Sequence, residues 1–367
     1  MSMYSVGNSL YTGRRSLNIV GRRKVWFSVA IFFVLASLAS FFIREPNLGI
    51  EFRGGSQFTV SGTELSEHQP AYDVISEVSD SVPRVSNVGQ ESVRVQTEEL
   101  GDQATQDVRR ELAEAYGVQE SEVTSTFIGP SWGQDILAQA IRAMIIFMVA
   151  ISIVLMAYFR SWTIAVGAIG ALLHDFVVTL GVYWVLGLEV TPATVIGLLT
   201  IMGYSLYDTV VVFDKVRENT TELTEQHELT YAEEANLAIN QTLIRSLNTS
   251  ITGILPVLAV LVIGVWILGA DTLRDLSLVM FVGMLLSAIS SIFVAAPLAV
   301  ALAERSPEIR AHTEEVLARR GENPDPLPDT TERATKPSGN ISTERVAGGH
   351  RGQGAQPKRQ KKKRKKR

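Results

Sequence analysis

Six long apolar runs, separated by polar segments, dominate the hydrophobic pattern of this chain. Each run is long enough to cross a hydrocarbon layer of about 30 Å at a helical rise of about 1.5 Å per residue. The runs occupy residues 25–43, 136–158, 162–186, 190–213, 249–268 and 276–302. The pattern therefore predicts a polytopic α-helical membrane protein with six transmembrane helices.

A large polar segment, residues 44–135, lies between the first two runs. Apolar and polar residues alternate at 56–62 and 91–99, which is typical of strands, and 121–129 is a third candidate strand. Helical spacing appears at 71–80 and 105–117. The order β-α-β-α-β predicts a small ferredoxin-like α+β domain.

Lys and Arg gather in every second connection, which predicts the orientation of the chain. They are frequent in segment 1–24 and after the last run, whereas the connections at 187–189 and 269–275 hold few. We therefore expect a multi-pass protein of the cell membrane with both termini cytoplasmic and the α+β domain extracytoplasmic. The basic residues that carry this prediction are Arg14, Arg15, Arg22, Arg23, Lys24, Arg160, Lys215, Arg217 and Arg245.

An alternative for run 25–43 is a cleaved signal peptide, because basic residues precede it and Ser37-Leu38-Ala39 resembles a cleavage site. The apolar part of a signal peptide usually spans only about 7–15 residues, and this run is longer. We therefore favour a retained transmembrane helix.

The tail, residues 303–367, is rich in Pro, Gly, Ser, Thr and charge, which predicts a disordered segment. It ends in KRQKKKRKKR, a block that binds anions without sequence specificity. Anionic lipid or ribosomal RNA would suit it beside a membrane, and a solvated tail without a specific partner is the equal alternative.

The composition excludes several kinds of chemistry. The chain has no cysteine, so disulfides and thiol-based sites are absent. It has no nucleotide-binding signature and no metal-ligand spacing, and His68 is best read as a surface histidine. We expect no cofactor, no metal and no enzymatic activity, so any work must draw on a partner or an ion gradient.

A few ionisable residues interrupt the apolar runs. Asp208, Asp175 and His174 lie within them, and Arg245 lies just before the fifth run. A charge at such depth is costly unless it pairs, faces water or exchanges a proton. Arg245 remains charged and could pair with Asp208 only when that carboxyl is ionised, which would be a proton-coupled element.

Other interpretations of the same residues remain open. A structural ion pair that only holds helices together would also explain Asp208 and Arg245. His174 can form a local hydrogen bond, and Asp175 has one adjacent polar partner. Asp214 lies at the edge of its run, where a charge requires no special account.

Five segments resemble, in order, signatures of the SecF family. GIEFRGGSQF (49–58) is similar to a G-x-D-F-x-G-G-T segment of SecD and SecF proteins, and it contains Gly54 and Gly55. GYSLYDTVVVFDKVREN resembles the most specific signature, which includes Gly203, Tyr204, Ser205 and Asp214. The remaining segments are ALLHDFVVTLG (171–181), NQTLIRSLNTSITG (240–253) and SSIFVAAPL (290–298).

The resemblance implies a function. SecF proteins have a bundle similar to RND transporters, pair with SecD, and use the proton-motive force to help export preproteins beside a SecYEG-type translocon. Asp208 and Arg245 match the family's proton-coupling positions, and Asp175 is our third candidate. Tyr207 stands where asparagine is usual; Glu51 and Ser246 are milder departures.

Two alternative functions follow from the same pattern. An RND-type small-molecule exporter normally has about twice as many spans and a second large outward loop, which this chain lacks. A structural scaffold of the translocon would use the buried charges only to pack helices. A SecD-like partner would count against the exporter, and proton-dependent activity would count against the scaffold.

Overall fold

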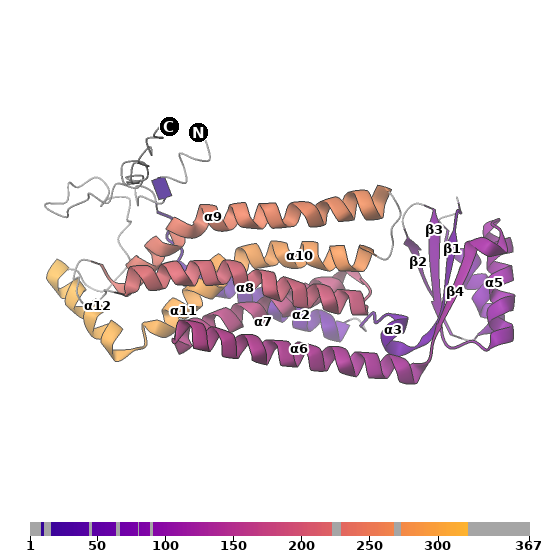
Figure 1. The fold of residues 1–367 in the computed structure, drawn as a ribbon, viewed down its shortest axis with the longest axis horizontal. Coiled ribbons are helices and arrows are strands. Elements are labelled where there is room, and N and C mark those ends of the chain that lie inside the picture. The colour runs from indigo at the N-terminus through magenta and orange to yellow at the C-terminus, as the bar shows by residue number, and fades with distance from the viewer. Residues whose placement is uncertain are drawn as a thin grey trace, which may run out of the picture.

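A bundle of long helices carries a small α+β domain at one end (Figure 1). The computed structural model describes residues 9–10, 16–43, 46–63, 67–79, 81–88, 91–221, 229–267 and 273–321. Within these residues, six helical segments are long and apolar enough to cross a membrane, which confirms the six predicted spans. The helices are α2 (Arg23–Ile43), α6 (Pro130–Phe159), α7 (Trp162–Leu186), α8 (Pro192–Thr220), α9 (Tyr231–Ala259) continuing as the π-helix η3 (Val260–Ile267), and α10 (Arg274–Ser290) continuing through the π-helix η5 (Ser291–Ala295) into α11 (Ala296–Ala303).

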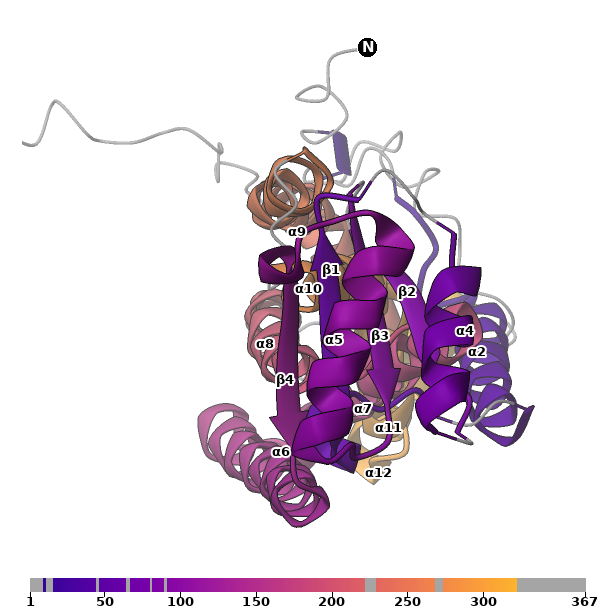
Figure 2. The ribbon, with the colours of Figure 1, turned by 90° about the vertical axis from the view of Figure 1, so that its right-hand side faces the viewer.

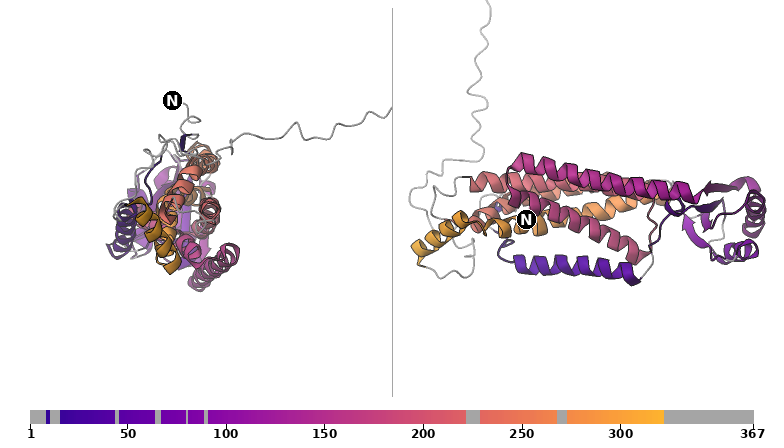
Figure 3. Two further views of the ribbon diagram at one scale, coloured as in Figure 1. Left: turned by 90° about the vertical axis from the view of Figure 1, so that its left-hand side faces the viewer. Right: turned by 90° about the horizontal axis from the view of Figure 1, so that it is seen from below.

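The six spans differ in how far the protein itself covers them. About half of the most apolar window of α7 and of α8 is buried, at 56% and 50%, against 6% for α2 and for α6. Figures 2 and 3 show α2 and α6 on opposite flanks of the bundle, with α7 between them. The centre of the bundle is therefore built by α7, α8 and α10, and their polar side chains are shielded by protein on most sides.

The α+β domain is a four-stranded antiparallel sheet in the order β2-β3-β1-β4. Helices α4 and α5 cover the face of the sheet that points away from the bundle (Figure 2). Strand β2 was not predicted, because its five residues lack a clear alternation of buried and exposed positions. With it, the order becomes β-α-β-β-α-β, which is ferredoxin-like. The elements are β1 (Gly55–Ser61), α4 (Gln69–Val78), β2 (Arg84–Val88), β3 (Ser92–Thr97), α5 (Asp102–Tyr116), η1 (Glu120–Glu122) and β4 (Val123–Ile128).

The core of this domain follows from the two periodicities in its sequence. Alternate residues of the strands and every third or fourth residue of the helices point inward. The side chains of Phe58, Val60, Ile75, Val95 and Leu112 are fully buried there. The domain thus has its own hydrophobic core, separate from that of the bundle.

A helix occupies the first part of the tail that we predicted to be disordered. Helix α12 (Pro307–Arg320) begins with proline in its first turn and ends at Gly321 in a left-handed conformation. The guanidinium of Arg320 donates to both carboxylate oxygens of Glu233 at 2.9 Å, and Val316 is buried. The prediction of disorder from residue 303 is therefore wrong for α12, because this long-range ion pair cannot be read from local composition. Residues 322–367, with the basic block and its expected anionic partner, lie outside the described residues.

Helix α9 also begins well before its apolar run, at Tyr231 rather than near residue 249. Thr230 caps it, accepting from the backbone N–H of Glu233 while the Glu233 carboxylate accepts from Thr230. Two asparagines in this extension hold the N-terminal segment. Asn240 accepts from the backbone N–H of Leu17, and Asn236 accepts from those of Ile19 and Val20.

Candidate functional site

Asp175 lies on α7 in the centre of the bundle and is 2% exposed. Its Oδ2 accepts hydrogen bonds from Ser290 Oγ at 2.7 Å and from Ser205 Oγ at 3.1 Å. The Nδ1 atom of His174, which precedes it, lies 3.2 Å from Oδ1. Three polar partners thus surround this carboxyl, whereas the sequence had indicated only the adjacent histidine.

Asp208 lies on α8, one turn after Ser205, and is 3% exposed. Its Oδ2 accepts from Ser291 Oγ at 3.0 Å. Ser291 follows Ser290 directly, at the junction of α10 and the π-helix η5. Two consecutive serines of one helix therefore contact two aspartates on two other helices. We call Asp175, Ser205, Asp208, Ser290 and Ser291 the serine–aspartate cluster.

Arg245 is not part of this cluster. Its side chain is on an exposed face of α9, and the next residue, Ser246, is the one that points into the bundle. The expected pair of Asp208 with Arg245 is not formed in the described part of the chain, because Arg245 is exposed on α9 whereas Asp208 is buried, where it bonds to Ser291. Arg245 thus presents a charge on the outside of the bundle.

The neighbouring part of α8 joins α9 through a tyrosine. The Tyr204 hydroxyl donates to the backbone oxygen of Thr249 at 2.7 Å, one turn beyond Arg245. Gly253 makes room for it, since a Cβ there would lie 2.3 Å from that hydroxyl. Gly203 and Tyr207 are exposed on α8. A Cβ on Gly203 would meet no atom within 4 Å. Tyr207 therefore points away from the cluster.

The remaining motif residues have separate places. Asp214 is exposed near the end of α8, as expected for a charge at the edge of the apolar run. Gly54 and Gly55 form the turn between the short helix α3 (Ile50–Arg53) and β1, with φ values of 81° and 130°. A Cβ on Gly54 would lie 2.6 Å from Pro130 Cα, and one on Gly55 would lie 2.4 Å from the Thr97 oxygen. Only glycine fits this turn, which seats α3 against the start of α6.

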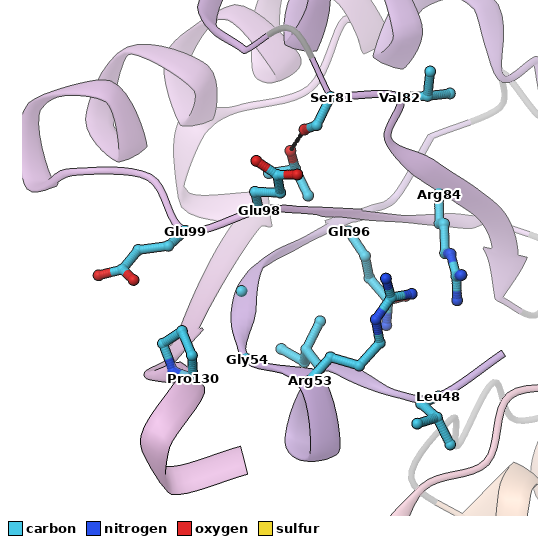
Figure 4. A pocket seen from close by; sticks show the side chains of 13 residues that line it. Leu48, Arg53, Gly54, Ser81, Val82, Arg84, Gln96, Glu98, Glu99 and Pro130 are labelled. Carbon is cyan, nitrogen blue, oxygen red and sulfur yellow. Dashed lines mark hydrogen bonds between the residues drawn. The ribbon is translucent and has the colours of Figure 1, made fainter. Parts of the chain in front are cut away.

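Two cavities border the α+β domain. One of about 570 Å³ opens beside Gly54, and Arg53, Arg84 and Glu98 are among the residues that line it (Figure 4). The other, of about 430 Å³, lies between the sheet and the ends of α7 and α10. Both cavities are lined by basic and acidic side chains. The domain therefore contacts the bundle through polar rather than apolar groups.

Charged and neutral polar side chains make that contact, which we call the domain joint: Glu51, Arg94, Gln96, Glu189, Thr191 and Asp275. Arg94 Nη1 on β3 lies 3.2 Å from Glu189 Oε2, and Gln96 Nε2 donates to Glu189 Oε1 at 2.7 Å. Thr191, the N-cap of α8, donates to Asp275 Oδ2 on α10 at 3.1 Å. Three carboxyl groups thus gather near Arg94.

Within the described residues, Glu51 brings a buried oxygen without a hydrogen-bond partner to the domain joint. Its Oε2 is buried and has no hydrogen-bond partner among the described residues. Burial is the main cause of a raised pKa for the Glu51 carboxyl, and the carboxylates of Glu189 and Asp275 add to the rise, while its own backbone N–H and Arg94 oppose it. The joint is therefore sensitive to the charge of this residue.

Comparison with known proteins places these features in a class. The description "Protein export membrane protein SecD/SecF, C-terminal" matches residues 108–305, and "SecD/SecF GG Motif" matches residues 39–62. The chain is therefore a multi-pass membrane protein of the SecD/SecF protein-export class, and the Gly54–Gly55 turn is its GG motif.

The more particular assignment follows from individual relatives. The SecF translocase subunit of Mycobacterium tuberculosis is 42% identical over 86% of this chain and 74% of its own length. That of Streptomyces coelicolor is 40% identical over 87% and 85%. The crystal structure of SecDF from Thermus thermophilus matches with a TM-score of 0.71 at 30% identity, over 79% of this chain and 39% of the other. The chain belongs to the SecF family of protein translocase subunits, which are transport proteins and not enzymes.

Sequence reasoning found Asp175 and Asp208 but missed the side chains that hold them. Ser290 and Ser291 were visible only as part of a family segment, although two consecutive serines within an apolar run are themselves a signal of buried polar partners. The domain joint was missed altogether, because its members come from four separate parts of the chain.

Proposed function

We propose that this chain uses the proton-motive force, with a SecD-like subunit, to assist the export of preproteins through a SecYEG-type translocon. The observation that carries the proposal is the serine–aspartate cluster: two buried carboxyl groups in the centre of a membrane bundle, held by hydroxyl groups. Acidic groups inside a membrane are costly and commonly mark proton pathways. Asp208 is the proposed proton-exchanging residue, with Asp175 beside it.

Hydroxyl partners suit a proton-exchanging carboxyl. A serine hydroxyl can donate to an ionised carboxylate, and its lone pairs can accept from the protonated acid. Asp208 with Ser291, and Asp175 with Ser205 and Ser290, would therefore remain hydrogen-bonded in both protonation states. A permanent ion pair would instead hold the carboxyl in its ionised form.

The exposed position of Arg245 supports a partner at this face of the bundle. An exposed arginine at the margin of an apolar span is costly when it has no ion-pair partner, so a second protein surface with a complementary acidic group would stabilise it. The relative named SecDF in Thermus thermophilus is 33% identical, and the match covers only 37% of its length. A SecD-like subunit is therefore the proposed partner, and it would cover Arg245, Gly203 and Tyr207.

Replacement of each charged residue tests the function. Asp208→Asn and Arg245→Met are reconstituted separately with the SecD-like subunit and the translocon, and preprotein export is measured with and without a proton gradient. Each variant should lose the gradient-dependent part and keep the rest. Arg217→Met and Glu218→Gln, at the exposed end of α8, are matched controls that should behave as wild type. Full gradient-dependent export in both variants would instead support the scaffold alternative.

The proposed orientation has the α+β domain outside and both termini in the cytoplasm. Because the chain has no cysteine, single cysteines report it without background. A membrane-impermeant maleimide applied outside should label Ser121→Cys on η1, and should label Glu314→Cys on α12 only after the membrane is opened. The reverse labelling would contradict the orientation.

A further inference from the structure

Ser290 has two acceptors for one hydrogen. Its Oγ lies 2.7 Å from Asp175 Oδ2 and 3.3 Å from the backbone oxygen of Ser287. A hydroxyl carries a single hydrogen, so it can donate fully to only one of them at a time. The shorter distance shows that the aspartate is the preferred acceptor in this structure, and the carbonyl is the available alternative.

The serine–aspartate cluster is shielded from bulk water. Asp175, Asp208, Ser205, Ser290 and Ser291 are each no more than 3% exposed. A buried carboxyl that loses a hydrogen-bond partner therefore cannot replace it from bulk solvent. The protonation state of each aspartate must be accommodated by the side chains already present.

The local winding of the helix explains how adjacent serines come to serve different helices. The π-helix η5 begins at Ser291 and runs to Ala295, and Pro297 follows it within α11. Proline lacks an N–H and its ring conflicts with the carbonyl four residues earlier, so regular α-helical bonding is interrupted before it. Short π-helical segments are frequent at functional sites. Here the interruption coincides with the two serines that contact α7 and α8.

We propose that Ser290 and Ser291 are positioning residues that hold Asp175 and Asp208 from adjacent positions of one helix, and that Ser290 reverses its hydrogen bond when Asp175 takes up a proton. The ionised Asp175 accepts from Ser290. After protonation, the new O–H of Asp175 donates to Ser290 Oγ, and the Ser290 hydrogen turns to the Ser287 carbonyl. No covalent bond other than the O–H of Asp175 forms, and the proton comes from the pathway of the proposed function, on which this inference rests.

His174 is the titratable neighbour of Asp175 on its own helix, and the nearest acid of the cluster, Asp208 on α8, bonds to Ser291 rather than to Asp175. The Nδ1 atom of His174 contacts Asp175 Oδ1, the oxygen that the serines do not use. Its Nε2 is buried without a hydrogen-bond partner among the described residues. His174 can therefore keep its contact with Oδ1 while the hydrogen bond between Ser290 and Oδ2 reverses. The two oxygens of Asp175 thus have different partners.

The test uses Ser290→Ala and Ser291→Ala in the complex with the SecD-like subunit. Gradient-dependent export should fall about tenfold in each, as expected for loss of a hydrogen bond to a charged group. The double variant should lose less than the product of the two single losses, because coupled residues are not additive. Ser290→Thr and Ser291→Thr keep the hydroxyl and should recover most of the activity.

Ser287→Ala is the matched control. Its Oγ is buried on the same helix, one turn earlier, and has no hydrogen-bond partner among the described residues. Its removal leaves the backbone carbonyl in place and should not reduce export. If Ser290→Ala and Ser291→Ala behave like Ser287→Ala while Asp208→Asn abolishes gradient-dependent export, the inference fails and the proposed function stands. If Asp208→Asn also has no effect, the proposed function itself fails.

Infrared difference spectroscopy supplies a readout that a purely structural role would not move. The carboxylic C=O band that Asp175→Asn removes should shift to higher wavenumber in Ser290→Ala, because the protonated acid loses its acceptor. The carboxylic C=O band of Asp208, identified as the band that Asp208→Asn removes, should change its wavenumber in Ser291→Ala. An unmoved Asp175 band in Ser290→Ala, or the absence of any band that depends on Asp175 across the working pH range, would overturn the proposed reversal.

Discussion

The serine–aspartate cluster and the domain joint both bring acidic residues together inside the protein, the cluster fully buried and the joint partly buried, but they are stabilised in different ways. In the cluster, neutral hydroxyls of Ser205, Ser290 and Ser291 contact the carboxyl groups. In the joint, the charged guanidinium of Arg94 faces Glu189, with Glu51 and Asp275 nearby. Neutral partners tolerate either protonation state, whereas a guanidinium favours the ionised form. Under the proposed function, the cluster would exchange protons, whereas the joint would hold the α+β domain in place.

The two regions are connected by the helices that carry them. Asp275, at the start of α10, accepts from Thr191 at the cap of α8, and its backbone oxygen accepts from the Tyr183 hydroxyl of α7 at 3.3 Å. The same three helices hold the cluster deeper in the bundle. A movement of α7, α8 or α10 at the cluster would therefore reach the joint through direct contacts.

Removal of the central charge of the joint should have the largest effect on stability. Arg94→Met leaves the partly buried Glu189 without its cation, which should cost about 3 kcal/mol, the lower end of the range for fully buried ion pairs. Thermal unfolding of the purified protein in detergent measures the loss. The control is Arg110→Met, whose pair with Asp107 on α5 is largely exposed and should contribute about 0.5 kcal/mol or less. Equal losses in both variants would contradict the central role of Arg94.

The turn that positions the joint should be the next most sensitive element. Gly54→Ala places a Cβ 2.6 Å from Pro130 Cα at a positive φ, which should cost about 1–3 kcal/mol. Gly203→Ala is the control, since a Cβ there meets no atom within 4 Å in this chain. The free energy of unfolding should fall for Gly54→Ala alone. A similar fall for Gly203→Ala would show that the turn is not the cause.

Loss of charge in the cluster should be better tolerated than in the joint. In Asp175→Asn, the amide oxygen can still accept from Ser205 and Ser290, so we expect a loss of about 1 kcal/mol. Asp175→Leu keeps no acceptor and leaves both hydroxyls unpaired, so it should destabilise the protein more. Unfolding measurements on the two variants separate these effects. A larger loss in Asp175→Asn than in Arg94→Met would reverse the comparison between the two regions.

The pH dependence of the joint should give the smallest effect. Because the pKa of Glu51 is raised in the folded state, the folded protein binds more protons than the unfolded chain between the ordinary and the raised pKa. The contribution of Glu51 to stability is therefore fully present below the ordinary glutamate pKa and is lost as the pH rises through the folded-state value. Glu51→Gln should raise the melting temperature at about pH 8 and approach wild type near pH 4.

A matched variant makes the Glu51 result specific. Glu114→Gln replaces an exposed glutamate of α5, where substitutions change stability by no more than about 0.5 kcal/mol. A lower melting temperature for Glu51→Gln at pH 8 than for wild type would contradict the destabilising role of the Glu51 charge.

The spans, the class of the α+β domain and the two aspartates could be predicted from sequence because each is a local property. Hydropathy depends on consecutive residues, and Asp175 and Asp208 are conspicuous because their neighbours are apolar. Strand β2 was missed because its sequence has no clear period. Helix α12 was missed because the polar composition of the tail hid its local signals, Pro307 in the first turn and Gly321 at the end, and the bond of Arg320 to Glu233, 87 positions away, cannot be read from local sequence.

The sequence by itself determined that this is a membrane protein, since long apolar runs must be removed from water. It also determined a folded domain in the first connection, since that segment has strand and helix periodicity. Only the tertiary structure decided what the buried acids contact. Ser290 meets Asp175 across 115 positions and Ser291 meets Asp208 across 83, while Arg245 turns to the outside of α9. These contacts depend on the rotation and depth of each helix against its neighbours, and side-chain packing sets both.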